Sequence, residues 1–108
     1  MPQTELLLTQ GDNGGSIAAR VGDTLTIQLP ETPATGFRWR LPAGGRGGLA
    51  LVGDDFEPAP RSAVGGGGLR RLRFAARRSG AAQLEIRLAR SWEAGAPEAV
   101  FRIRVEVG

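Results

Sequence analysis

The chain contains 108 residues, with 14 Arg against 11 acidic residues and a formal net charge of +3, and it lacks Lys, His, Cys and Tyr. A chain of this length typically forms one domain and buries roughly 65% of its unfolded surface, enough for a core without disulfides or metal. The absence of His and Cys excludes Ser-His-Asp and Cys-His catalysis and most metal sites. We therefore expect no enzymatic activity, no metal and no cofactor, and the composition favours a binding protein.

The calculated isoelectric point of 11.2 overstates how basic the chain is. All of the cations are Arg, so almost no group titrates between the carboxylates and the guanidinium groups, and a small excess of positive charge raises the isoelectric point far. A net charge of +3 indicates solubility rather than a polyanionic partner, and we expect no nucleic acid to bind.

No apolar run reaches the ~20 residues of a membrane-spanning helix, so we expect no membrane partner. The first residues, Met1 to Glu5, have neither a basic segment nor a small-residue cleavage site of an export signal. The sequence as it stands therefore predicts a cytoplasmic protein, and a periplasmic or secreted one if a signal has been removed.

Apolar and polar residues alternate with a period of two along most of the chain, which is typical of strands with one buried face. In chain order, the predicted strands are residues 6–8, 17–20, 24–29, 37–41, 49–52, 69–78, 81–90 and 101–107. No stretch has the i, i+3, i+4 spacing of a helix, and 17 Gly and 7 Pro disfavour helices. About eight short strands predict an all-β sandwich or barrel.

Turn sequences separate these strands, among them Asp12-Asn13-Gly14-Gly15, Gly22-Asp23 and Ser79-Gly80. The last of them predicts one long hairpin, in which residues 69–78 pair with residues 81–90. The outward face of this hairpin is rich in Arg, which is typical of a solvated strand face that blocks pairing with other chains.

Three segments contain residues that a sandwich does not need. In residues 32–37, Pro33 fixes its own φ and Gly36 permits a φ that other residues avoid, which predicts a rigid loop. Residues 65–68 are four glycines, which are costly to order unless another backbone approaches closely. Residues 90–93 place Trp92 where strand alternation has ended, and Trp and Arg are typical interface anchors.

The order and spacing of these three segments resemble the chagasin-like family, proteinaceous inhibitors of papain-type cysteine peptidases. That family has an Asn-Pro-Thr-Thr-Gly-Tyr/Phe loop, then Gly-x-Gly-Gly before a strand, then Arg-Pro-Trp. The corresponding segments here are Thr32-Pro33-Ala34-Thr35-Gly36-Phe37, Gly65-x-Gly67-Gly68 and Arg90-Ser91-Trp92-Glu93. Val21-Gly22-Asp23 and Trp39 are also similar to the family, and the resemblance covers residues 6–107.

The resemblance implies a single inhibitor domain over residues 1–108, an immunoglobulin-like β-sandwich of seven to eight strands with three functional loops at one end. It implies a monomer that reversibly and tightly blocks the active-site cleft of a papain-type cysteine peptidase. The first loop would lie over the catalytic Cys-His pair, and the other two would contact opposite walls of the cleft. The peptidase-binding residues implied are Thr32, Pro33, Ala34, Thr35, Gly36, Phe37, Gly65, Gly66, Gly67, Gly68, Arg90, Ser91, Trp92 and Glu93.

The sequence also departs from the family pattern. Thr32 replaces Asn, Ala34 replaces the first Thr, Phe37 stands where Tyr is common, and Ser91 replaces Pro. Ala34 removes a hydroxyl near the catalytic cysteine, which leaves Thr35 as the polar group there. We expect the binding mode to persist, with affinity or target range altered.

Three alternatives stay open at this point. The scaffold could have lost inhibition and acquired another partner. It could be an arginine-rich module for nucleic acid or another polyanion, although a chain without Tyr offers few aromatic residues for base stacking. The arginines of that module would be Arg70, Arg71, Arg73, Arg77, Arg78 and Arg87. Finally, Asp54, Asp55 and Glu57 could form a catalytic acid pair, but neighbours on one short loop seldom face each other as glycosidase carboxylates do.

Overall fold

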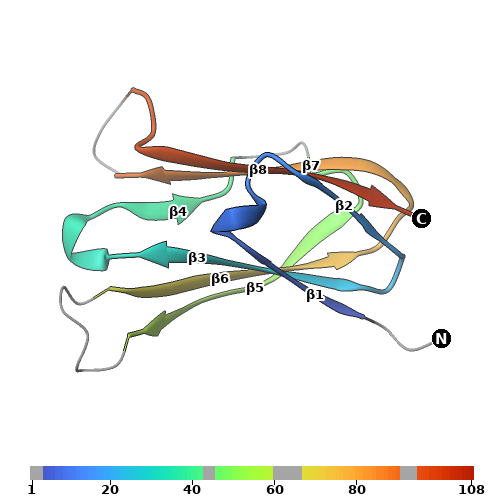
Figure 1. The fold of residues 1–108 in the computed structure, drawn as a ribbon, viewed down its shortest axis with the longest axis horizontal. Coiled ribbons are helices and arrows are strands. Elements are labelled where there is room, and N and C mark those ends of the chain that lie inside the picture. The colour runs from blue at the N-terminus through green and yellow to red at the C-terminus, as the bar shows by residue number, and fades with distance from the viewer. Residues whose placement is uncertain (1–3, 43–45, 60–66, 91–94) are drawn as a thin grey trace.

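The computed structural model describes residues 4–42, 46–59, 67–90 and 95–108. Within them, eight strands form two four-stranded sheets that pack face to face (Figure 1). One sheet has the order β1-β3-β6-β5, with β1 (Glu5–Thr9), β3 (Thr24–Glu31), β6 (Gly68–Ala76) and β5 (Leu49–Pro58). The other has the order β2-β8-β7-β4, with β2 (Ser16–Ala19), β8 (Ala99–Val107), β7 (Gly80–Ala89) and β4 (Arg38–Arg40). The prediction of an all-β sandwich is confirmed.

The helical content of the described residues is limited to two short 3-10 turns, η1 (Gln10–Asp12) and η2 (Pro33–Thr35). No helix among these residues is long and apolar enough to cross a membrane. The edge strands β1 and β2 pair in parallel with β3 and β8, whereas the other strand pairs are antiparallel.

The core lies between the middle strands of the two sheets. Its large, fully buried side chains are Leu25, Ile27, Leu29, Leu72, Phe74, Leu84, Ile86, Phe101, Ile103 and Val105. All of them occupy inward positions that the alternating pattern predicts. Burial of each such side chain contributes roughly 1.5–3 kcal/mol, so this layer supplies most of the force that holds the sheets together.

The predicted hairpin of residues 69–78 and 81–90 is wrong. β6 and β7 lie in different sheets, and the chain crosses from one sheet to the other between them. Phe74 and Ile86, both completely buried, therefore belong to opposite sheets instead of lying side by side in one sheet. β7 pairs with β8, and β6 pairs with β3 and β5. Alternation indicates which face of a strand is buried, but it does not identify the neighbouring strand.

Strand β5 is longer than the predicted residues 49–52. A bulge between Leu51 and Gly53 interrupts the alternation, and Gly and Asp are poor strand formers, which is why the pattern ended too early. After the bulge, Asp54 lies opposite the inward-facing Leu72, and Asp55 lies opposite the outward-facing Arg71. The two neighbouring carboxylates therefore belong to opposite faces of the sheet, so they do not form a facing acid pair.

The Val21-Gly22-Asp23 segment has a structural role at the turn between β2 and β3. The buried Asp23 carboxylate accepts hydrogen bonds from the backbone N–H of Arg20 at 2.9 Å and of Thr4 at 3.0 Å. These two bonds lower the pKa of Asp23 below its ordinary value of 3.8 because they stabilise the ionised form. Asp23 thereby joins the start of the chain to the turn that leads into β3.

This arrangement makes stability depend on pH through Asp23. Because the pKa of Asp23 is lower in the folded state, its contribution is present above about pH 4 and is lost as the pH falls through the folded-state pKa. We expect Asp23→Asn to be less stable near neutral pH and to show a shallower loss of stability on acidification. Urea unfolding as a function of pH measures this. Asp55→Asn provides the control, since it makes the same substitution at an exposed carboxylate outside this turn.

Candidate functional site

The described parts of the three predicted loops lie at one end of the sandwich, opposite the two chain termini (Figure 1). Residues 32–37 lead from β3 in one sheet to β4 in the other, Gly67 precedes β6, and Arg90 follows β7. The predicted site residues Gly65, Gly66, Ser91, Trp92 and Glu93 fall outside the described residues. The fold thus brings Thr32 to Phe37, Gly67, Gly68 and Arg90 to the same end.

Residues 32–37 form a compact loop that is closed by its own hydrogen bonds. Pro33 begins the 3-10 turn, and the backbone N–H groups of Thr35 and Gly36 donate to the carbonyls of Thr32 at 3.1 Å and Pro33 at 2.9 Å. Gly36 ends the turn at a φ of 81°, which favours glycine and explains its presence. The exposed tip consists of Ala34 and Thr35. The predicted rigid loop is therefore a single 3-10 turn stabilised by Pro33 and Gly36.

The hydroxyl group of Thr35 is used within the loop. It donates to the carbonyl of Thr32 at 2.7 Å and accepts from the backbone N–H of Phe37 at 3.2 Å. A Ser or Thr hydroxyl that bonds nearby backbone in this way favours a turn over extended structure. Thr35 therefore holds the shape of the loop while its side chain lies at the exposed tip.

Arg90 braces the loop from the end of β7. Its guanidinium carbon lies 4.1 Å from the centre of the Phe37 ring, and its Nε donates to the carbonyl of Thr35 at 2.9 Å. Contacts between an Arg and the face of an aromatic ring are attractive at this distance. The sequence assigned Phe37 and Arg90 to two separate loops, and the structure places them against each other. No local sequence signal predicts this pair, because 53 positions separate the two residues in the chain.

Gly67 and Gly68 are positions where the backbone packs closely against its surroundings. A Cβ atom on Gly67 would lie 3.2 Å from Oγ1 of Thr32, so the second loop approaches the base of the first. A Cβ atom on Gly68 would lie 2.6 Å from the ring of Phe56 and would overlap the carbonyl oxygen of Glu57. Of the two explanations for the glycine run, close approach of another backbone therefore applies to Gly68, whereas the close neighbour of Gly67 is the side chain of Thr32.

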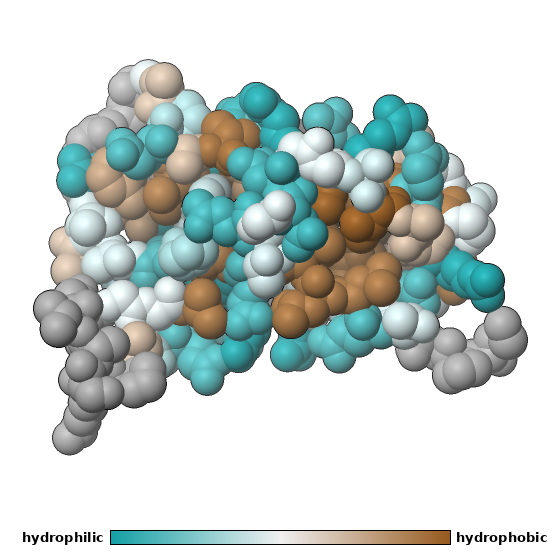
Figure 2. All heavy atoms as spheres, in the orientation of Figure 1, coloured by the Kyte–Doolittle hydropathy of each residue, from teal (hydrophilic) through white to brown (hydrophobic). Residues whose placement is uncertain are grey.

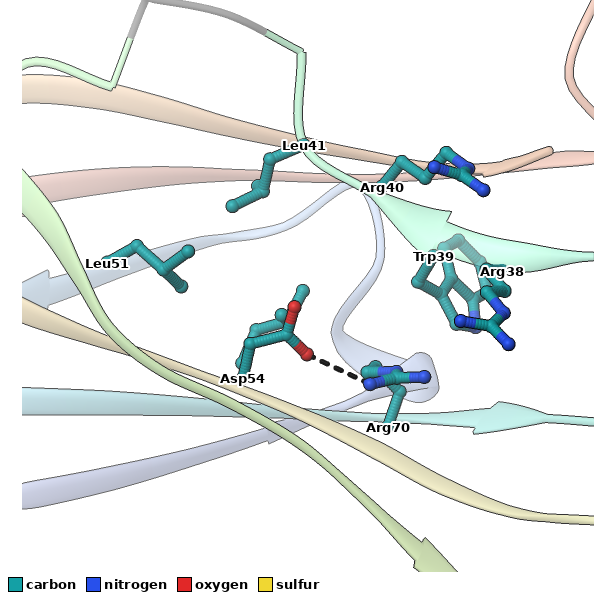
Figure 3. Close-up of a pocket in the computed structure, with 8 residues that line it drawn as sticks. Arg38, Trp39, Arg40, Leu41, Leu51, Asp54 and Arg70 are labelled. Carbon is teal, nitrogen blue, oxygen red and sulfur yellow. Dashed lines mark hydrogen bonds and ion pairs between the residues drawn. The ribbon is translucent and has the colours of Figure 1, made fainter. Parts of the chain in front are cut away.

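A groove runs along the open edge of the sandwich beside the loops, between β4 and β5 (Figure 3). It has a volume of about 350 Å³. Its lining residues are Arg38, Trp39, Arg40, Leu41, Leu51, Asp54, Arg70 and Leu72.

Within the described residues no three acidic side chains gather closely enough to hold a metal ion. The largest hydrophobic patch in the view of Figure 2 lies right of centre, away from the loop end.

Comparisons with known proteins give a consistent family and fold. The model of the family described as "Chagasin family peptidase inhibitor I42" matches residues 18–107. Chagasin from Trypanosoma cruzi is 26% identical over 89 aligned residues, and the match covers 79% of this chain and 81% of that protein.

Solved structures also share the fold, and two of them illustrate the match. The cysteine protease inhibitor EhICP2 from Entamoeba histolytica has a TM-score of 0.85 at 20% identity, and the match covers 98% of this chain and 97% of that one. PbICP-C, whose structure was solved in complex with falcipain-2, has a TM-score of 0.62 at 16% identity, covering 98% and 92% of the two chains. Because the family model matches most of the sequence, including the 32–37 loop, the chain belongs to the chagasin family of peptidase inhibitors.

Proposed function

We propose that this chain is a single-domain, reversible and tight-binding inhibitor of papain-type cysteine peptidases, which occupies the active-site cleft with three loops. The observation that carries the proposal is the 32–37 loop, a closed 3-10 turn with an exposed Ala34-Thr35 tip at the end of a rigid sandwich. Residues 65–68 and 90–93 would flank it on either side and contact the walls of the cleft.

The internal hydrogen bonds of the loop suit an inhibitor that is not cleaved. Extended peptides are recognised through main-chain hydrogen bonds that free N–H and C=O groups make in a strand-like conformation. In the 32–37 loop, the N–H groups of Thr35 and Gly36 are already bonded within the turn. The loop can therefore fill a cleft without presenting an extended, cleavable backbone.

Rigidity also supports tight binding. A loop that is ordered before association loses little conformational entropy when it binds. The braces from Thr35 and Arg90 fix the loop in the free protein, so the contacts with a peptidase are not offset by the cost of ordering it. The relatives agree with this proposal, because EhICP2 is named a cysteine protease inhibitor and PbICP-C was solved in complex with falcipain-2.

The arginine-rich alternative has less support. The six arginines that would form a basic patch do not share one surface, because β6 and β7 belong to different sheets. Arg70 forms ion pairs with Glu31 and Asp54, Arg71 with Glu57, and Arg87 with Glu85. These carboxylates neutralise three of the six arginines that a polyanion would need.

The proposal predicts inhibition of papain with a fluorogenic peptide substrate. We expect competitive, reversible inhibition with an inhibition constant below about 1 µM, corresponding to a binding free energy of at least about 8 kcal/mol. Absence of inhibition by the folded protein at that concentration would mean that the scaffold has lost this activity.

A substitution at the tip tests whether the 32–37 loop enters the cleft. In Ala34→Glu, a charged side chain would be forced into a desolvated contact, and we expect the inhibition constant to rise on the order of 100-fold, about 2.7 kcal/mol. Ala81→Glu is the matched control, since Ala81 is also exposed and lies next to Gly80, where β7 begins. Equal inhibition by the two variants would contradict insertion of the loop.

The third loop is tested through Trp92. An aromatic anchor that is desolvated in an interface typically contributes roughly 2 kcal/mol or more, so Trp92→Ala should raise the inhibition constant by about 30-fold. Thermal unfolding of the variant serves as the control for folding. Undiminished inhibition by a folded Trp92→Ala protein would exclude Trp92 as an anchor.

A further inference from the structure

Glu31, the last residue of β3, is a carboxylate buried in the sandwich. The residue is 2% exposed and its side chain is fully buried. It follows Leu25, Ile27 and Leu29 at the next inward position of the strand, where the pattern calls for an apolar residue. Burial of a charged group is unfavourable unless hydrogen bonds and an opposite charge compensate it. The position of Glu31 therefore requires dedicated partners.

Hydrogen bonds of Glu31 and its neighbours connect the two ends of the 32–37 loop. Its Oε2 accepts from the backbone N–H of Trp39, in β4, at 2.9 Å and from Nε of Arg70 at 3.2 Å, and its Oε1 accepts from Nη2 of Arg70 at 2.7 Å. The indole Nε1 of Trp39 donates to the carbonyl of Pro30 at 2.8 Å. Two hydrogen bonds therefore join residues 30 and 31, before the loop, to residue 39, after it.

Arg70 extends this set of contacts toward the second loop. Its Nη1 donates to Oδ1 of Asp54 at 3.1 Å (Figure 3), and its guanidinium carbon lies 5.5 Å from the centre of the Phe56 ring. The hydrogen bond to Glu31 raises the pKa of Arg70, which stays charged. Asp54 and Phe56 belong to β5, and Phe56 is the residue against which Gly68 packs. We call Glu31, Trp39, Arg70 and Asp54 the loop-base network.

The need for this network follows from the sheet topology. β3 pairs with β1 and β6, whereas β4 has three residues and pairs, among the described strands, with β7 alone. The 32–37 loop thus connects two strands of different sheets that share no ladder of backbone hydrogen bonds. The groove between β4 and β5 opens at the same place, with Arg70 and Trp39 among its lining residues (Figure 3). Side-chain contacts must therefore fix the separation of the two loop ends.

We propose that Glu31 and Arg70 are positioning residues that hold the ends of the 32–37 loop at one separation and couple the loop to the strands that carry the glycine loop. An isolated buried ion pair adds little to stability, and apolar residues of similar volume can replace one without loss. Its role here is the geometry of the loop. The effect on affinity rests on the proposed inhibitory function, whereas the effect on the free loop does not.

The decisive variant replaces the pair by apolar side chains of similar size, Glu31→Leu together with Arg70→Met. We expect this protein to fold with only a modestly lower unfolding temperature, because no unpaired charge is left inside and only the backbone N–H of Trp39 loses its acceptor. Without the network, the backbone amides of residues 35–39 should exchange with deuterium at least about 10-fold faster, while those of β7 and β8 keep their rates. The inhibition constant for papain should rise about 10-fold or more.

The matched control is Arg71→Gln. Arg71 is the next residue of β6, faces the opposite side of the sheet and forms an ion pair with the exposed Glu57, so its loss removes one positive charge without touching the network. For this variant we expect the same amide exchange rates and the same inhibition constant for papain as for the parent protein. Glu31→Gln serves as a second test, since it keeps the size of the side chain but removes its charge. In this variant the backbone amide of Trp39 should exchange with deuterium faster than in the parent protein.

The two readouts separate this inference from the proposed function. If the amides of residues 35–39 in the folded double variant exchange with deuterium at the rates of the parent protein, the positioning role is overturned, whatever the inhibition constant of the variant. Faster exchange with unchanged inhibition would overturn the claim that the loop geometry determines affinity. If the parent protein does not inhibit papain, the proposed function fails, and the exchange rates still decide whether Glu31 and Arg70 position the loop.

Discussion

The 32–37 loop, which carries the proposed site, must cross from one sheet of the sandwich to the other. Stacked sheets lie about 10 Å apart and share no backbone hydrogen bonds. The distance between the two ends of a loop that crosses from one sheet to the other is therefore set by side-chain packing between the sheets. Residues 32–37 meet this constraint with a 3-10 turn at the tip and two hydrogen bonds at the base. The shape of the loop is thus a property of the whole sandwich rather than of six residues.

Much of the fold could be predicted because strand alternation is a local property. It identified the buried face of β3, β6, β7 and β8, and Pro33 and Gly36 indicated a rigid loop between β3 and β4. Two features could not be predicted. The neighbour of β6 depends on contacts between distant segments, and the bulge after Leu51 disrupts the alternation from which the length of β5 was judged.

The contacts that support the site were harder to foresee, although one of them left a signal in the sequence. Glu31 continues the inward series of Leu25, Ile27 and Leu29, and a carboxylate at such a position implies a buried cationic partner. The identity of that partner, Arg70, is not encoded locally, because 39 positions separate the two residues. The contact of Arg90 with Phe37 is hidden for the same reason.

The exclusive use of Arg as the cation has a consequence at this site. A guanidinium group offers five N–H donors in a fixed plane, whereas an ammonium group offers three from one point. Arg70 uses this geometry to donate twice to Glu31 and once to Asp54, while its side chain stays largely buried. A Lys could neutralise Glu31, but it could not bind both of its oxygens and reach β5 at once. In a chain without Lys, the single side chain of Arg70 therefore joins the end of β3 to β5.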